Sequence, residues 1–382
     1  MTTRQPSPPL LVPERTKHPF LTHDMIREIP DAMQKTIENS SAQVESMAAQ
    51  LEDRPSYYFT GCGTAFFSAM LGSNILSLQD GNSLSWECVQ ALELTNNYSI
   101  ANRCAAFGVS HSGITKTTVD ALASVKAKGG YAVGITHFAD SPITKVADET
   151  LVVGNSPDKS RCHTKCYLAG ALPLTTMGIL LLEHRHGTDP DRIDKIRNEI
   201  AEIPQLAKKV LSSTEQSMKE LAEQNAGKRT IYFAGTGESY PNALEAALKI
   251  METSYLPSQG FETEQLLHGP WASVDDKTVV FVMATGSRTY SRNLDCVRAG
   301  TRLGSTVVPV VFEGNHDMAA ICPNTVELPR VDEYLAPYLS IIPLYWFSYY
   351  LSVRLGNNPD YLRYLNPTYW DARTIIFPAG TH

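Results

Sequence analysis

The sequence predicts an α/β protein made of two tandem doubly wound parallel-sheet domains that are joined by helices. The first reason is an internal repeat: residues 58–64 (YFTGCGT) recur as residues 232–238 (YFAGTGE), and each copy is an apolar run that ends in a glycine turn. The second reason is that short runs rich in Val, Ile and Phe alternate with helical patterns in both halves. Such alternation is typical of parallel sheets that are covered by helices.

Three further strands are expected after each glycine turn, in the same order in both halves. Residues 105–109, 131–135 and 150–153 correspond in this order to residues 279–283, 307–311 and 325–328. We therefore expect a first domain over residues 19–191 and a second over residues 229–360. A helical linker, rich in Glu, Lys and Ala, is expected over residues 192–228. Residues 1–18, which include four prolines, are expected to form a disordered lead, and residues 361–382 a C-terminal tail.

The composition favours a large core and excludes several kinds of partner. With 382 residues, of which 43% are hydrophobic, the chain is long enough for two domains. A net charge of -7 without any basic block argues against nucleic-acid binding. Seven scattered cysteines suggest no disulfide framework and no apolar run of signal-peptide length begins the chain, so a cytoplasmic protein is expected. The most apolar segment, residues 334–355, is interrupted by Pro337 and Pro343, which favours a buried helix over a membrane span.

One predicted helix carries charged residues that are suited to acid–base chemistry on a sugar. Glu245, Lys249 and Glu252 lie at positions i, i+4 and i+7, which form a single stripe, and His268 follows on a loop. Moving a proton between adjacent sugar carbons requires a base, and opening the ring requires a second group that protonates the ring oxygen. Glu252 and His268 are candidates for these two roles. The alternative is a solvated face, in which each ion pair stabilises the helix by only about 0.2–0.5 kcal/mol.

A turn rich in hydroxyl groups is a candidate anion site. Residues 110–115 (SHSGIT) follow a predicted strand and precede a helix, whose positive end favours phosphate. The alternative is that Ser112 or Thr115 simply caps the helix. The corresponding turn of the second half, residues 285–288 (TGSR), has lost the pattern. Because a requirement of the fold would appear in both copies, this asymmetry favours a function.

Neither a cofactor nor a metal is expected from the motifs. The two glycine turns begin like a dinucleotide fingerprint, but Phe66 and Tyr240 stand at the third glycine position. Glycines such as Gly63 are expected instead to let the backbone approach a ligand, with Thr64 turned toward it. Residues 162–166 (CHTKC) suggest zinc, yet a closed site needs four ligands and no matching pair stands at a suitable spacing.

Taken together, these motifs resemble the sugar isomerase (SIS) family, and within it the isomerase half of glutamine–fructose-6-phosphate aminotransferases. The resemblance rests on Gly-Cys-Gly-Thr, on Ser-x-Ser-Gly-x-Thr, on Ala-Leu-Glu-x-Ala-Leu-Lys-x-x-Glu-x-Ser-Tyr and on Leu-x-His-Gly-Pro, which occur in the family's order. It extends from about Pro19 to about Pro378.

The resemblance implies a role for each matching residue. The cradle for a sugar phosphate would consist of Thr64, Ser110, His111, Ser112 and Thr115, and His111 stands where the family usually has glutamine. Thr164 and Lys165 would line the same pocket. Glu252 would move the proton between C1 and C2, with Glu245 and Lys249 supporting it. His268 would open the ring and would be contributed across a homodimer interface.

Three departures from the family bear on the activity. The chain has no glutaminase domain and no cysteine after its first methionine, so hydrolysis of glutamine is not expected. Ala65 replaces a serine that the family uses on phosphate. Arg373 falls on or next to the position of the family's Schiff-base lysine, and an arginine stays protonated and cannot form that link.

The activity expected from these observations is that of an amino-sugar 6-phosphate deaminase or deglycase without a cofactor. Glucosamine 6-phosphate would be converted to fructose 6-phosphate and ammonia. A plain aldose–ketose isomerase of hexose 6-phosphates is one alternative, and a sugar-phosphate sensor without turnover is another. Neither nucleic acid nor a membrane is expected as a partner.

Overall fold

The computed structural model describes residues 11–79, 84–184 and 189–378, and it contains two five-stranded parallel sheets. The first sheet has the order β2-β1-β3-β4-β5 and the second the order β10-β9-β8-β6-β7, which is the same order read from the other edge. The predicted fold class of two doubly wound parallel-sheet domains is therefore confirmed.

Four strands of each half lie where the repeat predicts them, and one further strand of each half, β2 or β7, was not predicted. The first sheet contains β1 (Ser56–Thr60), β2 (Ser85–Cys88), β3 (Ala105–Val109), β4 (Tyr131–Thr136) and β5 (Glu149–Val152). The second contains β6 (Thr230–Gly235), β7 (Ser258–Glu262), β8 (Thr278–Met283), β9 (Thr306–Phe312) and β10 (Val326–Leu328). The two copies even share a stacked aromatic pair, because the ring centroids of Phe59 and Phe107 lie 5.1 Å apart and those of Phe233 and Phe281 lie 5.0 Å apart.

Helices cover both faces of each sheet. The first half has α1 (Leu21–Arg27), α2 (Ile29–Leu51), α3 (Thr64–Ser73), η1 (Asn74–Leu78), α4 (Ala91–Asn96), α5 (Lys116–Ala127), α6 (Pro142–Val146) and α7 (Lys165–Glu183). The second half has η2 (Gly237–Ser239), α9 (Tyr240–Thr253), α10 (Thr263–Leu267), η3 (Pro270–Ser273), α11 (Tyr290–Arg302), α12 (His316–Ala319), α13 (Pro337–Arg354) and α14 (Pro367–Ile376).

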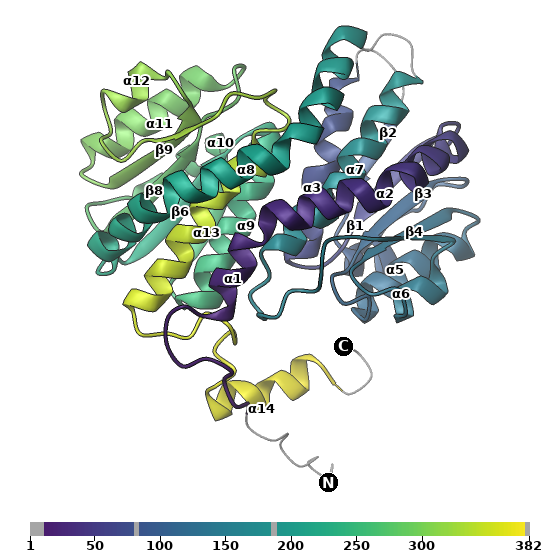
Figure 1. Cartoon of the computed structure of the whole chain (residues 1–382), viewed down its shortest axis with the longest axis horizontal. Coiled ribbons are helices and arrows are strands. Elements are labelled where there is room, and N and C mark those ends of the chain that lie inside the picture. The colour runs from purple at the N-terminus through teal and green to yellow at the C-terminus, as the bar shows by residue number, and fades with distance from the viewer. Residues whose placement is uncertain (1–10, 80–83, 185–188, 379–382) are drawn as a thin grey trace.

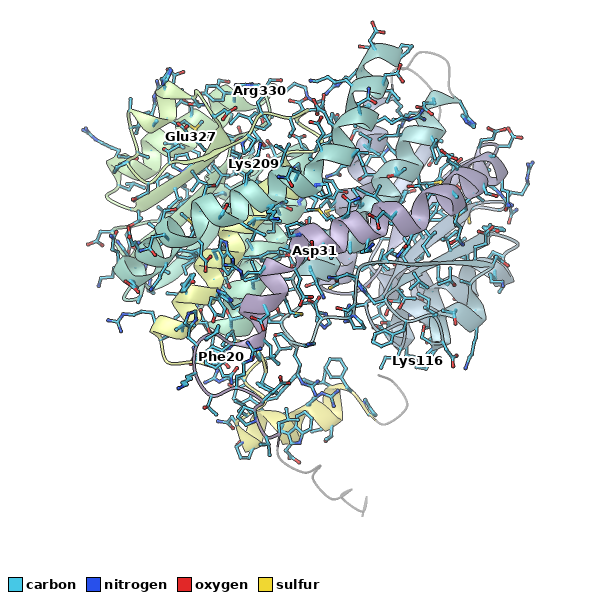
Figure 2. All side chains as sticks on the ribbon, in the orientation of Figure 1. Phe20, Asp31, Lys116, Lys209, Glu327 and Arg330 are labelled. Atoms are coloured by element: carbon cyan, nitrogen blue, oxygen red, sulfur yellow. The ribbon has the colours of Figure 1, made fainter. Side chains whose placement is uncertain are left out.

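A single long helix, α8 (Pro190–Asn225), occupies most of the range of the predicted linker and crosses the molecule, packed against α13 and α2 (Figure 1). The largest hydrophobic core joins the inner faces of both sheets to helices α2, α7, α8, α9 and α13. Two smaller hydrophobic clusters, one in each half, lie beneath the outer helices of that half. The halves are thus packed against each other through one shared core, and charged side chains such as Lys116, Lys209 and Glu327 lie outside it (Figure 2).

Two apolar helices are buried in this core. Helix α13, within the segment predicted to be a buried helix, has nearly all its residues inaccessible to solvent. Helix α7 is long and apolar enough to cross a membrane by length and composition, but 83% of its most apolar window is buried inside the fold. Such burial is typical of a helix in a hydrophobic core.

The described part of the N-terminal segment contacts the C-terminal region. The backbone N–H of Glu14 donates to the Tyr361 hydroxyl at 2.9 Å, and the Asn358 amide donates to the Arg15 carbonyl, also at 2.9 Å. Residues 1–10 and 379–382, which belong to the predicted lead and tail, lie outside the described residues.

Candidate active site

A cavity of about 340 Å³ opens at the carboxyl ends of β1, β3 and β4. Ligand sites of doubly wound sheets lie at this edge, where the strand order reverses. Helix α9 of the second half and the C-terminal segment complete the walls. The predicted site residues that line the cavity are Gly63, Thr64, His111, Ser112, Thr115 and Glu252.

The turn between β3 and α5 presents hydroxyl groups to the cavity. Its Gly113 has φ +68°, and a Cβ there would lie 2.1 Å from the Ser141 Oγ, so only glycine fits. The buried Ser110 hydroxyl donates to the Thr115 Oγ1 at 3.2 Å and shapes the turn. Thr115 is the N-cap residue of α5 but makes no side-chain capping bond, and Ser112 accepts only from the Ile114 N–H, at 3.4 Å. The capping alternative therefore does not account for these two hydroxyls.

The charged stripe of α9 is buried, which argues against a solvated face. Glu245 is 0% and Lys249 1% exposed. The Lys249 ammonium lies 2.5 Å from Oε2 of Glu252 and 3.5 Å from Oε1 of Glu245, and it donates to the Thr64 hydroxyl at 3.0 Å. The Tyr345 hydroxyl donates to Glu245 at 3.1 Å. Glu252 alone of the three reaches the cavity.

Burial and mutual attraction set the protonation of this stripe. Burial raises the pKa of Glu245 to about 7, although the Lys249 ammonium opposes the shift. Burial alone would lower the pKa of Lys249, but Glu245 and Glu252 outweigh it and raise that pKa well above its usual value. Lys249 therefore remains a cation that holds Glu252 in place.

The register of β3 and β4 brings two histidines together. Val109 pairs with Ile135, so His111 and His137, each two residues further, lie side by side, and the His137 N–H donates to the His111 carbonyl at 3.1 Å. Burial lowers the pKa of His111 to about 4 and that of His137 to about 3, with the Lys165 charge adding to both shifts. Both rings are thus neutral at pH 7. The ring of His163 lies against His111, with 4.2 Å between centroids.

Comparison with known sequences places this arrangement in a family. The sequence model of the SIS domain matches residues 50–179 and 226–354, which cover both halves of the chain. The chain belongs to the SIS domain family. The glutamine–fructose-6-phosphate aminotransferase (isomerizing) of Clostridium tetani is 27% identical over 343 residues, which are 88% of this chain and 56% of that protein. The chain thus spans about half the length of this relative and corresponds to its isomerase part.

Solved structures show the same fold at lower identity. The C-terminal domain of glucosamine-fructose-6-phosphate aminotransferase from Francisella tularensis has a TM-score of 0.81 and 21% identity, and the match covers 90% of this chain and 98% of that one. A glucosamine-6-phosphate deaminase from Thermotoga maritima has a TM-score of 0.72 and 22% identity, with 89% and 96% covered.

Other residues that the SIS resemblance singles out lie outside the cavity lining. Thr164 and Lys165 are buried, and the Lys165 ammonium binds Glu28 at 2.5 Å, Ser156 at 2.8 Å and Asn155 at 3.0 Å. In the single chain these two residues support the start of α7.

The two residues expected from more distant segments also lie outside the lining. His268 is 74% exposed and its Nδ1 lies 2.9 Å from the Glu264 carbonyl. Arg373 lies over the rings of Trp370, Phe377 and Tyr364, at 5.2, 5.5 and 5.9 Å from their centroids. An exposed His268 is compatible with use by a second SIS subunit, which stays a prediction.

Sequence reasoning missed several residues of the cavity wall. Arg161 brings a cation, His137 and Cys166 bring possible ligand atoms, and Leu362 and Phe377 bring apolar surface from the C-terminal segment. His137 had a detectable signal, because it lies two residues past the expected strand 131–135, as His111 lies two residues past the expected strand 105–109. The other four come from loops and helix ends whose positions no local pattern specifies.

The buried Glu245 carboxylate is expected to make stability depend on pH. Its raised pKa means that the folded chain keeps a proton which the unfolded chain loses at lower pH, so folding stability falls as pH rises from about 4.5 to about 7. Replacing Glu245 with Gln removes this effect. Between about pH 5 and about pH 8, the wild type should lose roughly 1–3 kcal/mol more than Glu245→Gln in denaturant titrations. The exposed control Glu202→Gln should follow the wild type, and parallel profiles for Glu245→Gln would contradict the analysis.

Proposed function

We propose that this SIS protein is a cytoplasmic enzyme that isomerises and deaminates amino-hexose 6-phosphates, with glucosamine 6-phosphate as the first substrate to test. The observation that carries the proposal is the position of Glu252. It reaches the cavity from a buried ion-pair network, and the hydroxyl-rich turn lines the same cavity. A base and an anion cradle on one small cavity are what proton transfer on a phosphosugar needs.

The phosphate group is assigned to the turn before α5. Ser112 and Thr115 supply hydroxyl donors, and the first amides of α5 lie at the positive end of that helix. Arg161 on the same cavity adds positive charge. The cavity volume of about 340 Å³ lies within the range of small-molecule sites, about 300–1,000 Å³.

Proton transfer is assigned to Glu252. Lys249 binds Oε2, so we assign Oε1 to the proton transfer. After ring opening, Glu252 removes the proton from C2 of the open-chain amino sugar while O1 gains a proton, and Glu252 then returns its proton to C1. The amine loses the proton that balances the one gained by O1, which leaves an imine at C2. Water adds to that imine, ammonia leaves, and fructose 6-phosphate remains. His268 of a second subunit is assigned to protonate the ring oxygen.

The similarity to known proteins supports a reaction of this type. The Clostridium tetani relative is an isomerizing aminotransferase of fructose 6-phosphate, and the Thermotoga maritima protein with this fold is a glucosamine-6-phosphate deaminase. A plain aldose–ketose isomerase uses the same base and cradle and is the second candidate. A sensor without turnover needs the cradle but no base, so the buried network around Glu252 argues against it.

Replacing Glu252 with Gln should lower turnover by about 10²–10⁴, because the amide cannot accept the proton, while binding of the phosphosugar persists. Single-turnover kinetics and calorimetric titration would measure the two effects. Glu223→Gln, on the exposed face of α8, is the matched control and should behave like the wild type. Near-normal turnover in Glu252→Gln would reject the assignment of the base.

Ser112→Ala and Thr115→Ala should each weaken phosphosugar binding by about 1–3 kcal/mol, since each removes a hydrogen bond to a charged group. Thr117→Ala is the control, because this hydroxyl lies 3.1 Å from the Cys62 thiol and is outside the cavity lining. Titration with the phosphorylated and the unphosphorylated sugar would separate the phosphate contribution. Unchanged affinity in both cavity variants would place the anion elsewhere.

A coupled assay for ammonia and ketose across amino-hexose 6-phosphates tests the reaction itself. We expect equal amounts of ammonia and fructose 6-phosphate from glucosamine 6-phosphate, and the reverse reaction from fructose 6-phosphate with high ammonium but not with glutamine. Ketose–aldose exchange without any ammonia would assign the chain to the plain isomerases. No turnover with any phosphosugar that binds would favour the sensor.

A homodimer with a shared site predicts complementation between inactive subunits. Glu252→Gln and His268→Asn chains, each nearly inactive alone, should regain part of the activity when mixed, because one hybrid site then holds both intact residues. The measurement is activity after subunit exchange, which labelled chains would demonstrate. Exchange without recovery would mean that each chain builds its site alone.

A further inference from the structure

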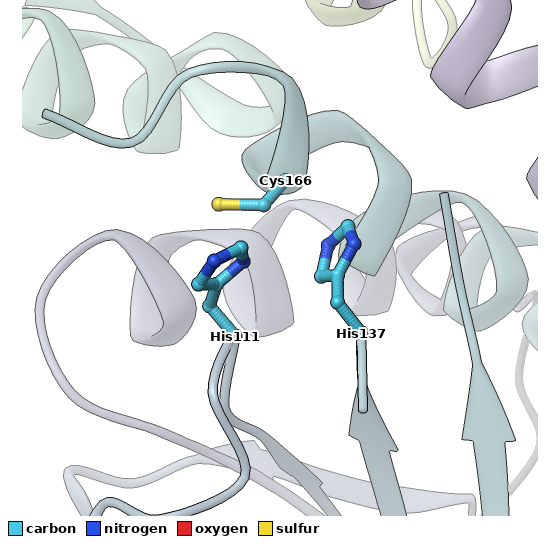
Figure 3. Close-up of side chains that lie close together, drawn as sticks. All are labelled: His111, His137 and Cys166. Carbon is cyan, nitrogen blue, oxygen red and sulfur yellow. The ribbon is translucent and has the colours of Figure 1, made fainter. Parts of the chain in front are cut away.

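Three side chains of the cavity wall form a cluster with ligand atoms for a metal ion. His111 follows β3, His137 follows β4, and Cys166 lies in the first turn of α7. One ring nitrogen of each histidine and the cysteine sulfur lie within 4.8 Å of one another, and Figure 3 shows the two rings side by side with the thiol of Cys166 above them. Strand register and a helix start, rather than a continuous sequence motif, bring these groups together.

Three ring nitrogens of this cluster lack hydrogen-bond partners within the described part of the chain. Both ring nitrogens of His137, which is 9% exposed, and Nδ1 of His111 are buried without a hydrogen-bond partner. Buried polar atoms in native proteins are nearly always satisfied, so three unsatisfied nitrogens in neighbouring rings indicate a ligand that the chain alone does not supply. Glycine at position 154 is also required here, because a Cβ would lie 2.5 Å from the His137 ring.

We propose that His111, His137 and Cys166 bind one zinc ion, whose fourth coordination position faces the sugar cavity. Imidazole nitrogen and thiolate sulfur are the ligands that zinc prefers, and three protein ligands with one open position are typical of catalytic zinc sites. Around a tetrahedral zinc ion such atoms lie about 3–4 Å apart, so small rotations of the side chains close the cluster. The Cys166 thiol loses its proton to solvent as the ion binds.

The donor set distinguishes zinc from other ions. Magnesium and calcium require oxygen ligands, which the three proposed ligands do not provide. Copper also binds two histidines and one cysteine, usually with a distant axial methionine, and the cavity lining contains no methionine among the described residues. The carboxylate of Asp158 accepts a hydrogen bond from the Cys166 backbone N–H at 3.3 Å and a second one from the Cys166 thiol, a bond that zinc would replace.

This site differs from the zinc motif that the sequence suggests. Residues 162–166 (CHTKC) contribute only Cys166, while the other two ligands come from the ends of β3 and β4. Ser112 and Glu252 line the same cavity, so the ion would lie next to the bound phosphosugar. A role in polarising a sugar oxygen rests on the proposed function, whereas binding of the metal does not.

The proposal is tested by titrating the chelator-treated full-length chain with Co²⁺, a spectroscopic substitute for zinc. One Co²⁺ per chain should bind and give the near-ultraviolet charge-transfer band of a cobalt thiolate, and added zinc should displace it. Cys166→Ser should lose the band, and His137→Gln and His111→Gln should bind at least about 100-fold more weakly. Cys62→Ser, which alters another cysteine of the same cavity, should retain the band and the affinity.

Two measurements on the wild type keep the proposal falsifiable if the variants fail to fold. Metal analysis of protein reconstituted with excess zinc and then desalted should find about one zinc per chain, and X-ray absorption should show one sulfur and two imidazoles around it. The proposal would be overturned if no zinc is retained, if the coordination shell contains no sulfur, or if the cobalt band persists in folded Cys166→Ser. Preferential retention of copper from an equal mixture would overturn the choice of zinc. None of these readouts uses a sugar, so their failure is distinct from failure of the proposed function.

Discussion

The buried ammonium of Lys249 is the interaction on which the whole site depends. An ammonium without solvent is stable only when it is paired, and its partners come from both halves of the chain. Glu245 and Glu252 lie on the same helix, α9, whereas Thr64 begins α3 of the first half. The ion pairs lie within α9, and the hydrogen bond from Lys249 to Thr64 is the contact that joins α9 to α3. Glu252, a residue of the second half, thereby reaches a cavity whose hydroxyl-rich turn belongs to the first.

The two halves share a fold but use the same edge of the sheet differently. In the first half the turn after β3 directs its hydroxyls into the cavity. In the second half the equivalent turn after β8 is occupied by its own chain, because the N–H and the hydroxyl of Ser287 both donate to the Glu333 carboxylate, at 2.9 and 3.0 Å. Arg288 likewise donates to the Tyr334 hydroxyl at 3.0 Å. A carboxylate of the protein thus takes the place that an anion would need, which gives a physical reason for the asymmetry seen in the sequence.

The fold was predictable because its signals are local and occur twice. Most strands are short apolar runs, the glycine turn repeats, and the two halves have the same strand order. The strands β2 (SWEC) and β7 (SQGFE) were not predicted, because they lack an apolar run. The stripe on α9 was predictable for the same reason, since helical spacing alone places Glu245, Lys249 and Glu252 on one face. The position of that face was not predictable, because only packing between halves decides whether it is buried or solvated.

The cluster of His111, His137 and Cys166 was not predicted from the sequence. Cys166 drew attention through a neighbouring cysteine and histidine in its own segment, yet its partners are residues at the ends of two strands. These residues come together because of the register of β3 and β4 and because of the position at which α7 begins. Residue spacing within one segment specifies neither. The sequence contains one sign of this cluster: His111 and His137 each lie two residues past an expected strand, 105–109 and 131–135.

The C-terminal segment closes one side of the cavity with apolar and aromatic side chains. Phe377 and Leu362 line the cavity, while the guanidinium of Arg373 is surrounded by aromatic rings of its own segment. The Arg161 guanidinium lies 5.8 Å from the centroid of Trp370, so the same aromatic group also positions a cation of the cavity wall. The rings of residues 364–377 thus hold Arg373 away from the cavity lining and Arg161 on it, which is why only one of these two guanidinium groups contributes charge to the cavity wall.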